Sequence, residues 1–460
     1  MKRLLIPFLA LLFGAGGLWG SSLIPAGSPP QRPLPVSKVK VSKVCAALET
    51  GTAKWQVVAA SRTGELISSE LGDEPTDAPS QLITLSQPPN PIRISAPRDD
   101  DFAGITWLAQ ADGPERGMST IACSTASTSL WFVGALLTTD ASAELNLYNS
   151  DSTDAIVDMA IYDANGRVPA PGARGIYVKA RSSYSVPLAA MSTAANPIAA
   201  SAFTIHLQTS QGRIAATLRQ HHWDKNAPRS SEWIPATAEP GLNVTLPGIP
   251  EGAGTREVVI VNPSNRTARL SVEFLGPEDT SLLPGTEDVE VPAFTTQSFS
   301  LTDAIGELPG ALRLISRNAE IAATVKVSAG EKVDQGFVAA PSQLGERGFW
   351  VLPDTTKTAA VLQVANSGTN EATAVLTTSA DLKEQSQQVI TVAPGTTAIV
   401  DLTAAPQTFL TLTTQSAQLQ AAVAFTRKVG DLAAVSVLPL DVDDSVSEKF
   451  TLSVDPHVGS

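Results

Sequence analysis

The feature that most constrains the fold of this chain is an internal repeat, present in three copies. In each copy an Asn is followed by Ser or Pro, and an Ala stands six positions after the Asn. The three asparagines are Asn149, Asn262 and Asn366, and they recur at intervals of about 105 residues. A repeat of this length corresponds to one structural unit, so we expect a series of related modules.

Two further landmarks keep the same order in all three copies. A Leu follows the Ala at near-constant spacing, and a strand such as GRIAATLRQ or AEIAATVKV leads through a polar turn to a Pro. The leucines are Leu188, Leu301 and Leu402, and the prolines are Pro235, Pro341 and Pro439. Several landmarks in a fixed order indicate a true triplication.

The residues after each Asn alternate between apolar and polar, as Ala155, Val157 and Met159 do around Asp158. Alternation with a period of two is typical of a strand with one buried face. Short strands of this kind, separated by Gly, Pro and Asn turns in units of about 100 residues, are typical of immunoglobulin-like or fibronectin-like β-sandwiches. We therefore expect an all-β chain of tandem sandwich modules, although the Cys, Trp, Cys pattern of antibody domains is absent.

The repeat also predicts the domain organisation. Three β-sandwiches are expected over residues 127–236, 237–345 and 346–445, with a C-terminal tail over 446–460. Residues 45–126 end in GITWLAQADGPERGMSTIACS, which resembles the ends of the other copies, so we interpret them as a degenerate fourth module. Its earlier strands are expected in KWQVVAAS and SQLITLS.

An apolar stretch from Leu4 to Ile24 follows the basic residues Lys2 and Arg3. It has about the 20 residues that cross a bilayer core. Because no good small-x-small cleavage site follows, we expect residues 1–24 to be an uncleaved, single-pass signal anchor with a cytoplasmic N-terminus. The alternative is secretion after cleavage. In both cases the body is extracytoplasmic, and the Pro-rich residues 25–44 form a semi-rigid stalk.

The chain has only two cysteines, Cys45 and Cys123. In an exported protein such a pair is more readily explained as a disulfide than as two free thiols. Metal ligation or a thiol nucleophile would need His or Cys neighbours that the sequence does not place beside them. We expect one disulfide that closes the degenerate module and compensates for its small core.

The formal net charge of -13 argues against a polyanionic partner such as nucleic acid. The local cluster of Lys38, Lys40 and Lys43 is interpreted as part of a solvated stalk.

Four histidines are present, and only His221 and His222 are adjacent. Neighbouring residues of a strand point to opposite faces, so these two are not expected to chelate a metal together. With Trp223 and Trp233 they form a candidate surface patch that would stack a sugar or a peptide. The alternative is that these aromatic residues cover their own module.

The sequence offers little catalytic chemistry. Motifs such as G-x-S-x-G, S-x-x-K, H-E-x-x-H and a Walker-type loop are absent. Two acidic groups stand in polar connections, at Asp99, Asp100 and Asp101 and at Asp441, Asp443 and Asp444. Neither has the Gly and terminal Glu of a calcium loop, so we expect no metal or cofactor. Glycoside hydrolysis needs only two carboxylates and stays open.

Parts of the sequence resemble a known family. The apolar N-terminus, Cys45, the run IACSTASTSLWFVG from Ile121 to Gly134 and the following LNLYN are similar to an uncharacterised family of secreted or membrane-anchored actinobacterial proteins. The resemblance implies a place at the cell envelope outside the plasma membrane. It implies no activity and supplies no catalytic residues.

Together these features favour a non-enzymatic, extracytoplasmic envelope protein whose sandwich surfaces bind a protein or a cell-wall polymer. Two alternatives remain: an enzyme of cell-wall glycan processing, and an accessory subunit that positions a membrane enzyme of glycan assembly.

Overall fold

The structure is a computed structural model that describes residues 40–442, apart from 49–53, 63, 76–77, 98–100, 226, 330–333, 343, 345, 354–356, 381, 383 and 403–407. The expected signal anchor (1–24), the stalk up to residue 39 and the tail (446–460) lie outside the described residues. Within the described part of the chain, no helix has the length and apolar character needed to cross a membrane.

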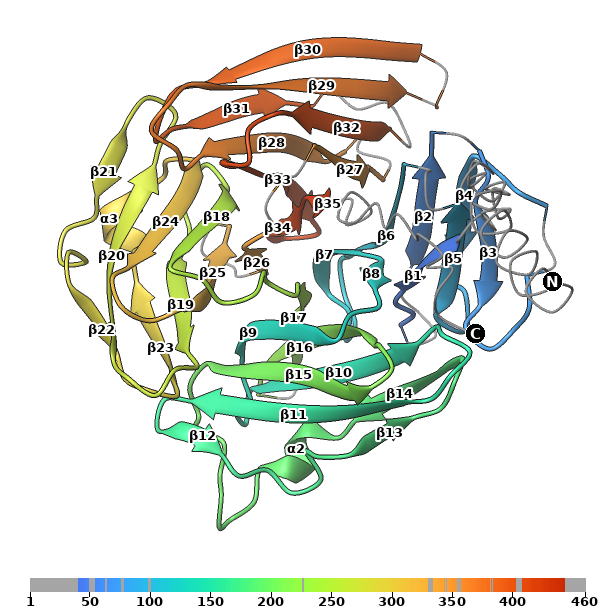
Figure 1. Ribbon diagram of the computed structural model, residues 1–460, viewed down its shortest axis with the longest axis horizontal. Helices are drawn as coiled ribbons and strands as arrows, with labels where there is room; N and C mark the ends of the chain where they lie inside the picture. Colours follow the sequence, from blue (N-terminus) through green and yellow to red (C-terminus); the bar gives the residue numbers. More distant parts are fainter. Residues whose placement is uncertain are drawn as a thin grey trace, which may run out of the picture. The chain divides into compact units, whose positions relative to one another are not determined.

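The described chain is all-β, and its strands pair antiparallel in eight sheets (Figure 1). We divide it into four segments, each with two sheets. The first segment (40–125) contains sheets of order β3-β5-β1-β8 and β4-β2-β6-β7. Its strands are β1 (Lys40–Cys45), β2 (Trp55–Ser61), β3 (Ile67–Glu70), β4 (Leu82–Ser86), β5 (Ile92–Pro97), β6 (Phe102–Gln110), β7 (Gly117–Ala122) and β8 (Ser124–Thr125).

The second segment (129–234) has sheets of order β12-β11-β15-β9, where β13 also pairs with β11, and β14-β10-β16-β17. Its elements are β9 (Ser129–Ala135), β10 (Ala141–Asn149), β11 (Ala155–Asp163), β12 (Gly166–Val168), β13 (Ile176–Val178), β14 (Ser182–Val186), α2 (Leu188–Met191), β15 (Phe203–Gln211), β16 (Ala215–Asp224) and β17 (Ala227–Ile234).

The third segment (243–339) repeats this arrangement, with sheets of order β18-β24-β20-β21, where β22 also pairs with β20, and β23-β19-β25-β26. Its elements are β18 (Asn243–Ile249), β19 (Arg256–Asn262), β20 (Ala268–Leu275), β21 (Thr280–Leu282), β22 (Val289–Val291), β23 (Thr295–Ser300), α3 (Thr302–Ile305), β24 (Gly310–Ser316), β25 (Ala322–Ser328) and β26 (Gln335–Ala339).

The fourth segment (347–442) has sheets of order β30-β29-β32-β27-β35 and β31-β28-β33-β34. Its strands are β27 (Arg347–Val351), β28 (Ala359–Asn366), β29 (Ala372–Ala380), β30 (Glu384–Val392), β31 (Thr397–Asp401), β32 (Phe409–Thr414), β33 (Leu419–Val429), β34 (Leu432–Pro439) and β35 (Asp441–Val442). The sheet that ends in β7, β17, β26 or β34 therefore has the same strand order in all four segments, including the first.

The alternation in the sequence is confirmed by burial. In β11 the residues Ala155, Val157, Met159 and Ile161 are buried, whereas the residues between them are partly exposed. These buried side chains meet residues of the second sheet of the same segment, such as Leu145 of β10, in one hydrophobic core. Burial of one strand face is thus what joins the two sheets of a segment.

The repeated Asn has the same structural role in each copy. The buried side chain of Asn262 donates from Nδ2 to the carbonyls of Arg266 and Val291, and its Oδ1 accepts the backbone N–H of Ser264. Asn149 and Asn366 make the equivalent bonds. An amide supplies both donors and an acceptor, so it can fasten a turn to the neighbouring strand where Ala cannot.

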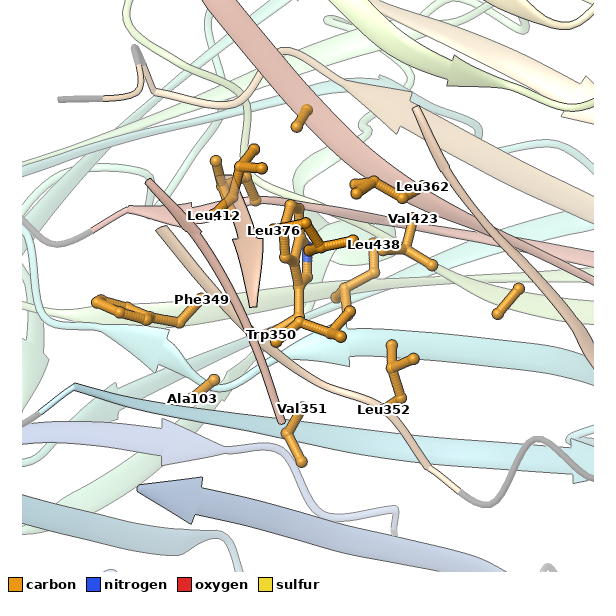
Figure 2. Close-up of a cluster of buried hydrophobic side chains, with 14 of the residues drawn as sticks. Ala103, Phe349, Trp350, Val351, Leu352, Leu362, Leu376, Leu412, Val423 and Leu438 are labelled. Atoms are coloured by element: carbon orange, nitrogen blue, oxygen red, sulfur yellow. The ribbon is translucent and has the colours of Figure 1, made fainter. Parts of the chain in front are cut away.

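The four segments contact one another in a closed cycle, which the sequence did not predict. Strand β7 packs against β17, β17 against β26, β26 against β34, and β34 against β7 (Figure 1). The last segment therefore packs against the first. Figure 2 shows part of the shared core, where Ala103 of β6 lies near Phe349, Trp350 and Val351 of β27.

A disulfide stabilises the first segment, and ion pairs join it to the fourth. Cys45 and Cys123 form the predicted disulfide, which joins the end of β1 to the residue after β7. Asp101 is 3% exposed, and its carboxylate forms ion pairs with Arg62 and with Arg347 of the fourth segment, each at 3.1 Å. Its sequence neighbours Asp99 and Asp100 lie outside the described residues. In the second expected acidic group, Asp441 of β35 pairs with Lys43, and Asp443 and Asp444 are not described. Lys43 lies in β1 and is 7% exposed, so the prediction that it belongs to a solvated stalk is wrong.

Candidate functional site

The predicted aromatic patch is divided by the strand that carries it. His221 and Trp223 lie on the same face of β16, and their rings stack with centroids 5.9 Å apart. His222 lies on the opposite face, where the positive charges of Lys326 and Arg229 help to lower its pKa. Trp233 is only 2% exposed, so our placement of it in a surface patch is corrected. Its indole packs under the guanidinium of Arg219, 4.1 Å from the ring centroid.

Arg219 forms a buried ion pair at the contact between the first two segments. Its Nε donates to Glu115 Oε2 at 2.8 Å, and the Ser231 hydroxyl donates to the same oxygen at 3.0 Å. Burial alone would raise the pKa of Glu115, but Arg219 and the nearby His221 hold it below its ordinary value. The pair therefore stays charged and links β16 to the residues before β7.

A solvent-open cavity of about 330 Å³ lies where Arg229 of β17 meets residues of the third segment. Its walls come from strands and loops of the second and third segments. The lining residues are Arg229, Thr255, Glu257, Ser300, Thr302, Lys326 and Gln335. We call this the Lys326 cavity. It could not be predicted from the sequence, because its residues are widely separated in the chain and form no local motif.

Positive charge dominates one wall of the Lys326 cavity. Burial, together with the charges of Lys326 and Arg229, lowers the pKa of His222 to about 4, so this imidazole is neutral at pH 7. Burial also lowers the pKa of Lys326, and Glu257 opposes that shift. Glu257 Oε2 lies 3.8 Å from Lys326 Nζ, which is too long for a hydrogen bond. The cavity can thus accept an anionic group together with hydroxyls.

Two buried carboxyl groups lie where the four central strands meet. Asp334 Oδ2 accepts the backbone N–H groups of Met118 and Val435, and burial raises the pKa of this carboxyl to about 7. Burial also raises the pKa of Glu232 well above its usual range, and the charge of Asp334 adds to this rise. One oxygen of each group, Asp334 Oδ1 and Glu232 Oε2, has no hydrogen-bond partner among the described residues.

In the described part of the chain these carboxyl groups line neither the Lys326 cavity nor the clefts beside Arg266, Thr373 and Tyr184. The described residues also include no cluster of three or more His, Cys, Asp or Glu side chains that would suit a metal ion. The central carboxyl groups are thus interior parts of the contact between segments.

Two shallower clefts occupy equivalent ends of the third and fourth segments. The first has a volume of about 760 Å³, and Arg266 and Arg317 line it beside Glu320. The second has a volume of about 520 Å³, and Thr373, Thr413 and Gln415 line it. Both lie near the turns that Asn262 and Asn366 stabilise, so the repeat places a cleft at the same end of these two segments.

Comparison with solved structures finds a crystal structure of a tetra-tandem repeat in the extending region of a large adhesion protein. It is 8% identical, the match covers 88% of this chain and 99% of that one, and the TM-score is 0.11. No curated protein matches the chain at a significant level. Residues 91–439 match one protein family, and this range takes in all of the second and third segments, most of the fourth and the last part of the first. By this match the chain belongs to the family of unknown function DUF5719.

Proposed function

We propose that this protein is a non-enzymatic, extracytoplasmic component of the cell envelope that binds a partner protein or a cell-wall polymer. In this proposal residues 1–24 anchor the chain in the membrane, or are cleaved on secretion. The stalk predicted over residues 25–44 is shortened to 25–39, because Lys40–Cys45 form strand β1. The modules over 45–126, 127–236, 237–345 and 346–445 are immunoglobulin-like or fibronectin-like sandwiches that present their surfaces outside the membrane.

The observation that carries the proposal is the Lys326 cavity. It is open to solvent, it is lined by two cationic side chains and several hydroxyls, and it lies at a contact between two segments. Backbone carbonyls and hydroxyls join those segments, for example where Thr296 donates to the carbonyl of Tyr162 at 2.8 Å. A polar site held by fixed strands is suited to recognition, because little side-chain or loop order is lost on binding.

The proposal is tested with the purified full-length chain. We expect it to sediment with an isolated cell-wall fraction in a saturable way, and crosslinking in intact cells to capture an envelope partner. Sedimentation equal to that of a heat-denatured sample, with no specific crosslink, contradicts the proposal. Turnover of envelope glycans by the purified chain contradicts its non-enzymatic clause.

A second candidate is glycan processing, and the Glu232–Asp334 pair is the observation that favours it. Two neighbouring carboxyl groups with raised pKa values are typical of acid–base catalysis. Their burial opposes this role, since Glu232 is 3% exposed and Asp334 is fully buried. If the pair is catalytic, Glu232→Gln abolishes a glycan-cleaving activity of the full-length chain; with a structural role there is no such activity to lose.

A further inference from the structure

The internal repeat shows that Lys326 stands where another copy has Arg219. The two strands align as IAATLR, starting at Ile214, and IAATVK, starting at Ile321. Their pairing agrees, because Arg219 lies opposite Trp233 of β17 and Lys326 lies opposite Phe337 of β26. Both cations therefore occupy the same position of the repeated sheet.

The two positions differ in their internal counter-ion. Arg219 is neutralised by Glu115, which stands two residues before β7 in the preceding segment. Lys326 lies in the third segment, and the second segment, which precedes it, ends in β17. Residues Arg229 to Ile234 of β17 align with Arg116 to Ile121 at the start of β7. In that alignment Pro228 takes the place of Glu115. The carboxylate that pairs with the cation in one copy is therefore missing from the next.

The Lys326 cavity lies at this position. Its two cations, Lys326 and Arg229, face a single acidic lining residue, Glu257, so the site carries a net positive charge. The Lys326 side chain is 16% exposed. Arg229 makes no ion pair or hydrogen bond within the described residues. A largely buried ammonium with one distant counter-ion favours binding of an anion.

We propose that the Lys326 cavity binds the carboxylate of a hexuronate residue, which takes the place that Glu115 occupies beside Arg219. A singly charged carboxylate matches the net charge of the cavity, whereas a phosphate dianion would exceed it by one negative charge. The exposed Ser300 offers a partner for a sugar hydroxyl, whereas Thr255 Oγ1 already bonds to Ser328 and Thr302 Oγ1 already accepts the backbone N–H of Arg256. Gln335 Oε1 has no donor within the described residues. The volume of about 330 Å³ is at the small end of ligand sites, which run from about 300 to 1,000 Å³.

This inference rests on the proposed function and names the chemistry of its ligand. The test titrates the full-length chain by calorimetry with glucuronate, and in parallel with glucose, acetate and inorganic phosphate. We expect saturable binding of glucuronate, weaker binding of acetate and phosphate, and none of glucose. Lys326→Met is expected to weaken glucuronate binding by about tenfold or more, because a desolvated charge pair is lost. Equal binding of glucose, or unchanged binding by this variant, overturns the proposal.

Pro228→Glu is the matched variant, since it restores the carboxylate that the other copy has. It is expected to fold, to keep both cations and to lose glucuronate binding because its own carboxylate fills the site. If it binds glucuronate as the unaltered chain does, the proposal is wrong. Cell-wall sedimentation separates the two hypotheses: sedimentation without glucuronate binding overturns only the uronate site, and glucuronate binding without sedimentation overturns only the envelope role.

Discussion

Asp334 accepts a hydrogen bond from the backbone N–H of Val435 at 3.2 Å, and so joins the start of β26 to β34. The same oxygen accepts the N–H of Met118 in β7 at 3.1 Å. One side chain thus connects strands of the first, third and fourth segments. A carboxyl oxygen can accept more than one N–H group, which makes Asp334 suited to this place.

The pH dependence of folding follows from the environment of Asp334. Burial raises its pKa from the ordinary value of 3.8 to about 7. The folded state therefore keeps the proton to a higher pH than the unfolded state does. The protonated Asp334 carboxyl therefore makes its full contribution to stability below about pH 4, and this contribution is lost as the pH rises to about 7. Asp334→Asn keeps an acceptor oxygen without ionising, so we expect it to be more stable than the unaltered chain at pH 8.

Chemical unfolding between pH 4 and pH 8 measures this effect. The difference in unfolding free energy between Asp334→Asn and the unaltered chain should grow with pH and then level off. Asp334→Ala is the control, because it removes the acceptor and is expected to destabilise the fold at each pH. A constant difference between the Asn variant and the unaltered chain would show that Asp334 is ionised throughout.

The Arg219–Glu115 pair is expected to be costly to break. Both residues are buried, and each single substitution leaves the other charge without its partner. We expect Arg219→Met or Glu115→Gln to lower the unfolding free energy by about 3–5 kcal/mol. Arg219→Met combined with Glu115→Met should cost less than the sum of the single changes. A double-mutant cycle by urea unfolding measures the coupling, and additive losses would refute it.

Each repeated Asn is expected to stabilise its turn through at least three side-chain hydrogen bonds. Asn262→Ala leaves buried backbone groups without partners, so we expect a loss of about 1–3 kcal/mol in unfolding free energy. Asn262→Asp should do no better, because a carboxylate cannot donate to the carbonyls of Arg266 and Val291. The exposed Asn90 provides the control, and Asn90→Ala should have little effect. Equal effects at Asn262 and Asn90 would contradict the assigned role.

Gly117 allows β7 to approach Asp334. A Cβ atom at this position would lie 2.4 Å from Asp334 Oδ1, and the backbone φ angle of +121° disfavours other residues. We expect Gly117→Ala to lower the unfolding free energy by about 1–3 kcal/mol, in the range of strained or overpacked substitutions. Gly241→Ala is the control, since the nearest atom would be 3.6 Å away. Thermal unfolding of both variants at the same pH compares them.

Removal of the disulfide should destabilise the first segment. Cys45 and Cys123 are 78 positions apart, so the bond restricts a long loop in the unfolded chain. Cys45→Ala combined with Cys123→Ala is expected to cost about 4 kcal/mol in unfolding free energy. Unfolding of the unaltered chain with and without reductant gives the same comparison, and the two measurements should agree. No change in either would contradict a stabilising role.

Much of the secondary structure could be predicted from the sequence, because the signals are local. A strand with one buried face needs apolar residues at alternate positions, and Ala155, Val157 and Met159 show this directly. The repeat could be found because Asn149, Asn262 and Asn366 each serve the same turn. The disulfide was predictable because the chain has only two cysteines.

The candidate site was harder to predict from the sequence than the strands were. His222 and Lys326 are about one repeat unit apart in the sequence, and nothing near either residue indicates that they lie close together. Trp233 was assigned to the surface because a Trp beside a turn has the same sequence pattern whether it is exposed or buried. The sequence also gave no sign that Glu232 and Asp334 differ from other acidic residues, since burial and not residue type raises their pKa values.

The sequence by itself thus determined the strands, their turns, the repetition of one unit and the pairing of the cysteines, because each depends on neighbouring residues or on simple counting. Only the tertiary structure decided that β34 packs against β7, that Asp334 joins three segments, and that Lys326 lacks the partner that Arg219 has. These relationships depend on which distant surfaces meet, and that is set by packing over the whole described chain.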